Sequence, residues 1–169
     1  MSAQLFTPFE ASQYASLQPM QMTDLDEVQA IERTLYAFPW TKGNFGDSLE
    51  AGYSAWVLRD HAGLPGATII GYFLLMNAVD EAHLLNVSIA AIHQGRGLGV
   101  VLLQKAAEIA RGGRARSMIL EVRPSNTRAL SIYERFGFRR IGVRRGYYPH
   151  QQSNPSLRED AWVMRFDLP

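Results

Sequence analysis

Residues 94–99 read Gln94-Gly95-Arg96-Gly97-Leu98-Gly99, and this run predicts a glycine-rich turn between a strand and a helix. An apolar segment at 84–89 precedes it. After it, apolar residues recur at the spacing of one helix face, namely Leu98, Leu102, Ala106 and Ile109. The first N–H groups of a helix lack intrahelical acceptors, and the helix dipole adds partial positive charge there. The turn is therefore a candidate site for a phosphate or pyrophosphate, to which Arg96 adds a formal charge.

Two well-known phosphate-binding patterns do not fit this run. The P-loop ends in Gly-Lys followed by Ser or Thr, whereas Gly99 is followed by Val100-Val101. The dinucleotide fingerprint needs Gly-x-Gly-x-x-Gly, and here the third glycine comes one place early. On these residues alone, a turn whose glycines only let a strand and a helix pack is an equal alternative.

Size and composition predict one ordinary globular domain. The chain has 169 residues, and its apolar share of 47% is enough for a hydrophobic core. A net charge of +1 argues against a nucleic-acid-binding protein, which usually has a strongly basic face. Basic residues do gather late in the chain, where a solvated strand and turn is a better interpretation than a site for an acidic partner or cofactor: Arg139, Arg140, Arg144 and Arg145.

We expect no disulfide, metal, export signal or membrane span. Cysteine is absent, which also excludes an acyl-cysteine intermediate. The histidines lack metal-ligand spacing, and they are His61, His83, His93 and His150. The start of the chain has no basic segment followed by an apolar one, and the longest apolar stretches, such as residues 68–76, are too short to cross a bilayer. A cytoplasmic location is consistent with these features.

The order of expected elements indicates an α/β protein with a mixed sheet. Residues 1–16 carry little periodic signal and are expected to form a loose extension before a single domain at 17–169. Expected strands lie at 17–22, 54–59, 67–76, 82–89, 116–123, 138–143 and 161–167. Expected helices lie at 23–36, 45–50, 98–112 and 126–136, and a turn is expected at 63–66.

The turn fits a further pattern, Gln-x-x-Gly-x-Gly, and so resembles the acetyl-CoA pyrophosphate loop of the GNAT acetyltransferases. Other stretches extend the likeness over residues 17–168 to the bacterial ribosomal-protein alanine N-acetyltransferases of the RimI type: Ala37-Phe38-Pro39-Trp40, Leu120-Glu121-Val122-Arg123, Ala129 to Glu134, Arg145 to Pro149 and Arg158 to Ala161. The resemblance implies a single-domain GNAT fold, in which a mixed central sheet splays into a V between its fourth and fifth strands with helices on both faces.

Acetyl transfer to an amine needs a base for the amine, donors for the oxyanion and an acid for the leaving thiolate. Glu121 lies in an apolar strand, where partial desolvation makes a carboxylate a better proton acceptor. From the residues alone, a structural glutamate paired with an arginine such as Arg123 is the stronger interpretation. The resemblance reverses this order, because the general base of the family occupies the glutamate of this motif.

The resemblance also implies an acid and a set of cofactor-binding positions. Tyr133 matches the general acid of the family, although a core tyrosine on an amphipathic helix is the alternative. Asn126 matches a CoA contact and suits a helix N-cap equally well. The backbone of Val87, Ser88 and Ile89 would pair with pantetheine. The pyrophosphate would lie on Gln94, Gly95, Arg96, Gly97, Leu98, Gly99 and Val100, although the extra glycine at 95 removes one anchoring side chain that the family often has.

For the acceptor, the resemblance offers Trp40, Tyr147 and Tyr148 as the walls of a peptide cleft, although each aromatic taken alone is more often core. The leading hypothesis is direct transfer from acetyl-CoA, as cosubstrate and without a metal, to the α-amine of a small-subunit ribosomal protein that begins with alanine. Two alternatives stay open, namely a GNAT enzyme for a small-molecule amine and a non-catalytic module that binds CoA and a partner.

Overall fold

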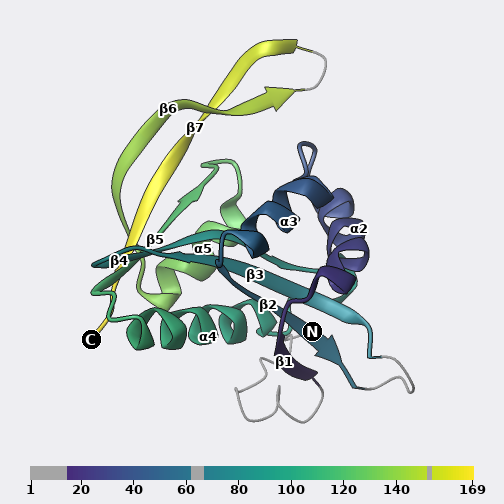
Figure 1. The fold of residues 1–169 in the computed structure, drawn as a ribbon. Helices are drawn as coiled ribbons and strands as arrows, with labels where there is room; N and C mark the ends of the chain where they lie inside the picture. Colours follow the sequence, from purple (N-terminus) through teal and green to yellow (C-terminus); the bar gives the residue numbers. More distant parts are fainter. Residues whose placement is uncertain (1–14, 62–66, 152–153) are drawn as a thin grey trace. The chain divides into compact units, whose positions relative to one another are not determined.

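The computed structural model describes residues 15–61, 67–151 and 154–169. Its strands are β1 (Ala15–Pro19), β2 (Ser54–Asp60), β3 (Ile69–Asn77), β4 (Glu81–Ile89), β5 (Ser117–Val122), β6 (Arg139–Gln151) and β7 (Asn154–Asp167), and its α-helices are α2 (Leu25–Leu35), α3 (Lys42–Glu50), α4 (Leu98–Gly112) and α5 (Thr127–Phe136) (Figure 1). The sheet order is β1-β2-β3-β4-β5-β7-β6. β4 runs parallel to β5, while β1–β2, β2–β3, β5–β7 and β6–β7 are antiparallel. The mixed sheet and the order of elements are confirmed.

The chain divides into two compact units. The first comprises the chain up to Leu75 together with Asn86–Ala106, and the second comprises Met76–Leu85 together with Ala107–Pro169. The single domain predicted at 17–169 stays a prediction. Residues 1–14 of the expected extension and the turn expected at 63–66 lie outside the described residues.

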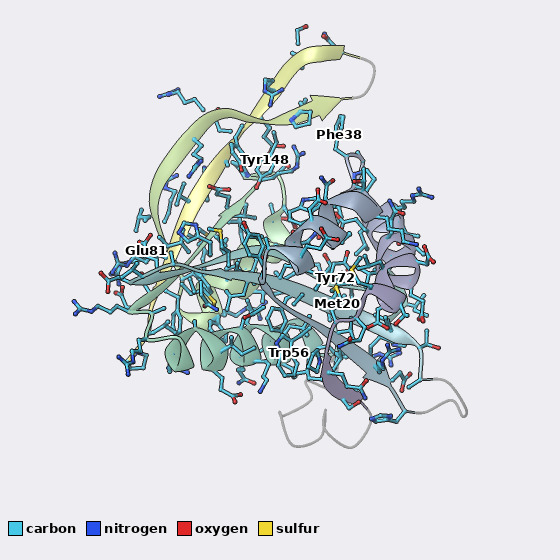
Figure 2. The ribbon with its side chains drawn as sticks, viewed as in Figure 1. Met20, Phe38, Trp56, Tyr72, Glu81 and Tyr148 are labelled. Carbon is cyan, nitrogen blue, oxygen red and sulfur yellow. The ribbon has the colours of Figure 1, made fainter. Side chains whose placement is uncertain are left out.

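In the first unit, α2 and α3 cover one face of the sheet. Apolar residues of these helices pack on inward-facing strand residues in one cluster, which contains Met20, Leu25, Val28, Phe45, Ala55, Val57, Ile69, Tyr72 and Leu74. Figure 2 shows Met20 and Tyr72 in this interior. Each strand alternates its side chains between two faces. The residues between Ala55, Val57, Tyr72 and Leu74 therefore point to the opposite face.

The first turns of α4 cover that opposite face of the first unit. Leu102 is fully buried, and a Cβ added at Gly71 of β3 would lie 3.4 Å from its Cδ1. Lys105 lies over the ring of Trp56 at 4.9 Å from the ring centre, on the side of the sheet where Figure 2 shows Trp56. Within this unit, helices on both faces of the sheet are confirmed.

The second unit carries α5 against the antiparallel strands β5, β7 and β6. The helix begins at the N-cap Asn126 and ends at Gly137, whose φ of 117° is the left-handed conformation typical of a glycine C-cap. On either side of Gly137 in the chain, Phe136 and Phe138 pack with Phe166, and the three ring centres lie within 5.9 Å of one another. This aromatic cluster fixes α5 to the sheet and thereby fixes the side chains that α5 carries.

Most boundaries differ from expectation by one to three residues, but the last two strands differ by more. β1 runs over Ala15–Pro19 rather than 17–22, because the segment Met22–Asp24 forms a 3-10 turn that leads into α2. β6 continues to Gln151 and β7 begins at Asn154, so 138–143 and 161–167 were underestimates. Their pairing shifts register three times, around residues 140–142, 144–148 and 149–151. These irregularities erase the alternation by which a strand is recognised in sequence.

Candidate active site

The glycine-rich turn has the predicted strand–turn–helix geometry. Gly95 and Gly97 have φ angles of 79° and 80°, a region that favours glycine. The amides of Val100 and Val101 both donate to the carbonyl of Gly97, at 3.1 and 3.4 Å, so the helical hydrogen bonds begin at Gly97. The predicted glycine-rich turn between a strand and a helix is therefore confirmed, and Gly95 and Gly97 are the residues whose conformation favours glycine.

The turn fits an anionic ligand. The amides of Leu98 and Gly99 lie ahead of the first intrahelical donor, at the positive end of a fifteen-residue helix. Among the described residues, a Cβ added at Gly99 would meet no packed neighbour within 4 Å, so open space adjoins this residue on its Cβ side. Arg96 is exposed, while Leu98 is buried and can offer a ligand only its backbone. The residues present therefore suit a pyrophosphate.

Gln94 anchors this turn from within the chain. Its side-chain Nε2 donates to the carbonyl of Ile89, the last residue of β4, at 2.9 Å. The bond closes the segment between the strand and the helix, so the turn is held at a set distance from β4. One donor of the Gln94 side-chain amide is therefore engaged with the protein, and the expected part of Gln94 in cofactor binding stays a prediction.

The end of β4 also offers its backbone rather than its side chains. Ser88 is buried, and its hydroxyl donates to Asn86 Oδ1 at 3.1 Å while it accepts from the Tyr36 hydroxyl at 2.7 Å. Ile89 is buried and Val87 is half-buried. Backbone pairing is the role that the resemblance implied for these three residues, and their side-chain environment is compatible with it.

Glu121 in β5 has two polar partners in the second unit. Its carboxylate pairs with Arg144 of β6, with 2.8 Å between Oε1 and Nε, and it accepts a hydrogen bond from the hydroxyl of Tyr147. The side chain is 24% exposed, so water and a ligand can reach it. The arginine that pairs with Glu121 is thus Arg144, and the expected partner Arg123 pairs instead with Glu159 at 3.2 Å.

Tyr147 and Tyr148 are brought to the same place as Glu121. Their rings meet edge to face at 4.9 Å, and Arg123 lies over Tyr148 at 4.2 Å from the ring centre. Burial raises the pKa of Tyr147, and its hydrogen bond to Glu121 raises that pKa further. Burial and the charge of Glu121 likewise raise the pKa of Tyr148, which Figure 2 labels. Both phenols are therefore neutral donors beside a carboxylate.

The predicted acid and the predicted N-cap both lie on α5. Tyr133 is half-buried, and its ring meets Phe138 at 5.7 Å, so it does contribute to the core. Asn126 caps the helix, because its Oδ1 accepts from the amide of Ala129 at 3.2 Å. Tyr133 thus does contribute to the core, and Asn126 does cap the helix. A further role for Tyr133 in catalysis or for Asn126 in CoA binding stays a prediction.

Trp40 belongs to the first unit and lies beside its core. Its ring meets Phe45 at 5.4 Å and packs against the cluster under α2 and α3. Its amide donates to Glu32 Oε1 at 3.0 Å. The interpretation as core is therefore confirmed for the ring, and a contact with an acceptor stays a prediction.

Two polar groups near these residues were missed in the sequence. Glu159 receives hydrogen bonds from Arg123 and from the amide of Ser125, and it holds the start of α5 near the β6–β7 pair. Glu32 is 2% exposed on the buried side of α2. A signal for Glu32 did exist, because it stands four residues after Val28 on the apolar helix face. Glu159 lies in the stretch Arg158 to Ala161 that carries the resemblance, but its partners Arg123 and Ser125 are distant in sequence and no local pattern marks them.

A metal-binding cluster and a membrane-spanning helix are both absent from the described residues. Across 15–61, 67–151 and 154–169, His, Asp and Glu side chains nowhere gather in a group of three that could hold a metal ion. Within that part of the chain, the helices also lack the length and apolar content needed to cross a membrane.

Comparison with known proteins identifies the class. The model of the acetyltransferase (GNAT) family matches residues 22–138, which include the glycine turn, Glu121 and Tyr133. The chain therefore belongs to the GNAT family of acetyltransferases.

Individual relatives and solved structures are more specific than the family model. The ribosomal protein bS18-alanine N-acetyltransferase of Escherichia coli strain K12 is 31% identical over 153 residues, which cover 90% of this chain and 97% of that protein. The crystal structure of the ribosomal-protein-S18-alanine N-acetyltransferase from Escherichia coli has a TM-score of 0.79 at 28% identity, covering 91% of this chain and 94% of that one. Arabidopsis thaliana NAA60 in complex with acetyl-CoA has a TM-score of 0.79 at 17% identity, covering 91% and 98%, and supports the fold alone.

Proposed function

We propose that this chain transfers the acetyl group of acetyl-CoA to the N-terminal α-amine of a small-subunit ribosomal protein that begins with alanine. The observation that carries the proposal is the likeness to bS18-alanine N-acetyltransferases over about nine-tenths of the chain, together with a turn that suits a pyrophosphate. We place the reaction in the cytoplasm, where ribosomal proteins are made, and we expect neither a membrane nor a nucleic acid to take part.

Acetyl-CoA supplies an activated acetyl thioester, and the chain supplies binding and proton transfer. The amides of Leu98 and Gly99, with Arg96, would hold the pyrophosphate, and the backbone of Val87, Ser88 and Ile89 would hold the pantetheine arm. Glu121 would take a proton from the acceptor nitrogen, directly or through a water, as the N–C bond forms. Tyr133 would give its phenolic proton to the sulfur as the C–S bond breaks.

The chemistry of the base favours an α-amine over a lysine side chain. An unperturbed α-amine has a pKa of about 8 and lysine of about 10.4, and this difference makes deprotonation of lysine costlier by about 3 kcal/mol near neutral pH. The proposed site has one carboxylate as base, and that carboxylate already accepts from Arg144 and Tyr147. A carboxylate that already has two hydrogen-bonding partners is better matched to the α-amine, whose proton is easier to remove than that of lysine.

Two peptides test the proposal through the release of CoA thiol. One carries the amino-terminal sequence of a small-subunit ribosomal protein with a free alanine amine, and the other has that amine blocked and its lysines free. Release with the first peptide alone is expected. Equal release with the blocked peptide would indicate a lysine acetyltransferase, release only with small amines would indicate the small-molecule alternative, and no release with any amine would leave a CoA-binding module.

A further inference from the structure

A buried carboxylate in the first unit ties together parts of the chain that are far apart in sequence. Glu32 Oε1 accepts from the amide of Trp40 at 3.0 Å. Its Oε2 accepts from the hydroxyl of Tyr72 on β3 and from Asn86 Nδ2 on β4, the latter at 3.1 Å. Glu32 is 2% exposed, so each of these donors is paired with a carboxylate that water scarcely reaches.

A second chain of hydrogen bonds connects this network to the segment from Tyr36 to Trp40. Tyr36 donates to Ser88, and Ser88 donates to Asn86. Burial raises the pKa of Tyr36 despite that bond, which keeps its hydroxyl neutral and able to donate. The segment is thus tied at both ends to β4 residues 86–88. Between the two ties stands Phe38, a large apolar side chain that is 37% exposed (Figure 2).

If the network only stabilised the fold, each buried polar group would need no more than a hydrogen-bond partner, and apolar side chains in the same place would stabilise the fold as well. This network does more, because it connects an irregular segment to the end of one strand. That strand end is the proposed pantetheine contact, and the segment carries the proposed acceptor contact Trp40. Resting on the proposed function, we infer that Glu32 is a positioning residue, which sets the Tyr36–Trp40 segment relative to Asn86–Ile89 and so determines the affinity for the acceptor.

Glu32→Gln sets the donor on one oxygen of the carboxylate, the Trp40 amide, against the donors on the other oxygen, which come from Tyr72 and Asn86. A glutamine offers one acceptor oxygen, whereas the Trp40 amide and Asn86 Nδ2 are obligate donors to different oxygens of Glu32. Tyr72 is fully buried, so leaving the core side unpaired is costlier than releasing Trp40 toward water. The variant is therefore expected to fold and to free the segment at Trp40.

The matched control is Asp24→Asn, another change from carboxylate to amide in the same unit. Asp24 is 7% exposed and pairs with Arg59 at 2.5 Å, and it contacts neither Trp40 nor β4 residues 86–88. We expect Glu32→Gln to raise KM for the alanine peptide about tenfold, the equivalent of one lost hydrogen bond, with acetyl-CoA affinity within about twofold of wild type. Asp24→Asn should leave KM within about twofold at a similar loss of Tm.

Two results would overturn the inference. One is an unchanged peptide KM in folded Glu32→Gln, and the other is an equal rise in the Asp24→Asn control, which would make the effect one of general stability. If Glu32→Gln does not fold, Tyr36→Phe removes the second tie at a half-exposed position, and a KM unchanged in that variant overturns the inference equally.

Hydrogen exchange at the Trp40 amide keeps the test separate from the proposed function. Exchange should accelerate at least tenfold in Glu32→Gln and stay unchanged in Asp24→Asn. That difference supports the anchor even if wild-type protein acetylates no alanine peptide, a result that would refute only the proposed function. Unaltered exchange in folded Glu32→Gln would refute the anchor itself.

Discussion

At the scale of single residues, the Glu121 side chain can be reached by a ligand and is also held in place by polar partners. Its carboxylate is one-quarter exposed, yet Arg144 and Tyr147 fix its orientation from one neighbouring segment of β6. A carboxylate restrained in this way presents its remaining lone pairs in set directions. The proposed base is therefore oriented before any acceptor arrives, which lowers the entropy that must be lost on binding.

Replacing Glu121 by glutamine should lower kcat by about 10²–10⁴-fold, the usual worth of general base catalysis. Raising the pH should restore part of the rate, because more of the acceptor amine is then already deprotonated. The melting temperature should change little, since the lost pair with Arg144 is partly exposed and contributes about 1 kcal/mol or less. Glu81→Gln, on β4 in the same unit, is the control and should keep wild-type rates. A Glu121→Gln enzyme with full activity across pH would rule out the assignment.

At the scale of elements, the turn at 94–99 joins a strand end and a helix start into one feature that suits an anion. Gln94 ties it to β4, the two left-handed glycines shape it, and α4 supplies the dipole. The turn would bind through its backbone, so its affinity depends on conformation more than on side chains.

Gly97→Val tests the turn directly. Valine at a φ of 80° is strained, so the turn should change shape while the sheet and helices stay folded. Acetyl-CoA should raise the Tm of the native protein by mass action, and this shift should be mostly lost in the variant. Gly112→Ala, at the other end of α4 where a Cβ meets nothing within 4 Å, should keep the shift. An undiminished shift in folded Gly97→Val would place the cofactor elsewhere.

The end of α5 carries a second structural requirement for glycine. Gly137 has a φ of 117°, and an added Cβ would lie 3.1 Å from Phe166 Cε2, inside the aromatic cluster. Gly137→Ala should therefore lower the free energy of unfolding by about 1–3 kcal/mol, measured by urea denaturation. Gly142→Ala in β6, where a Cβ meets nothing within 4 Å, should change it far less. Equal effects of the two substitutions would show that the C-cap conformation is not limiting.

At the scale of the whole molecule, the alkaline limit of stability should be set by tyrosines. Burial raises the pKa of four tyrosines, Tyr36, Tyr72, Tyr147 and Tyr148. Lysine also titrates at about pH 10, but the sequence has only two lysines, Lys42 and Lys105. A raised pKa means that the folded state holds its proton more tightly than the unfolded state. The stability linked to these groups is therefore present below about pH 10, the tyrosine pKa of an unfolded chain, and is lost as the pH rises above it.

Tyr72→Phe tests this pH dependence. Tyr72 is fully buried, and its pKa is raised by burial and then by the charge of Glu32. The variant should lose about 1 kcal/mol near pH 8 through the missing hydrogen bond to Glu32. Above about pH 10 its free energy of unfolding should fall less steeply than that of the wild type, because phenylalanine cannot ionise. Parallel curves in urea unfolding between pH 8 and 11 would contradict this account.

Local patterns in the sequence were enough to predict the elements that depend on neighbours along the chain. The spacing of apolar residues predicts α4 and α5, glycines predict where each ends, and the run at 94–99 predicts the turn and its anion-binding backbone. These features follow from backbone sterics and from helix periodicity, both of which act over a few residues. The same holds for Asn126, which caps α5 through a bond to a residue three positions away.

Contacts between distant residues were decided only by the tertiary structure. Glu121 pairs with Arg144 rather than with Arg123, because the β5–β7–β6 order puts only one strand between them and the long side chain of Arg144 spans it. Glu32 meets Asn86 across 54 positions. The β6–β7 pair likewise continues through register shifts around residues 140–142, 144–148 and 149–151. A pairing of this kind is selected by packing and desolvation over the whole fold, and no periodicity along the chain records it.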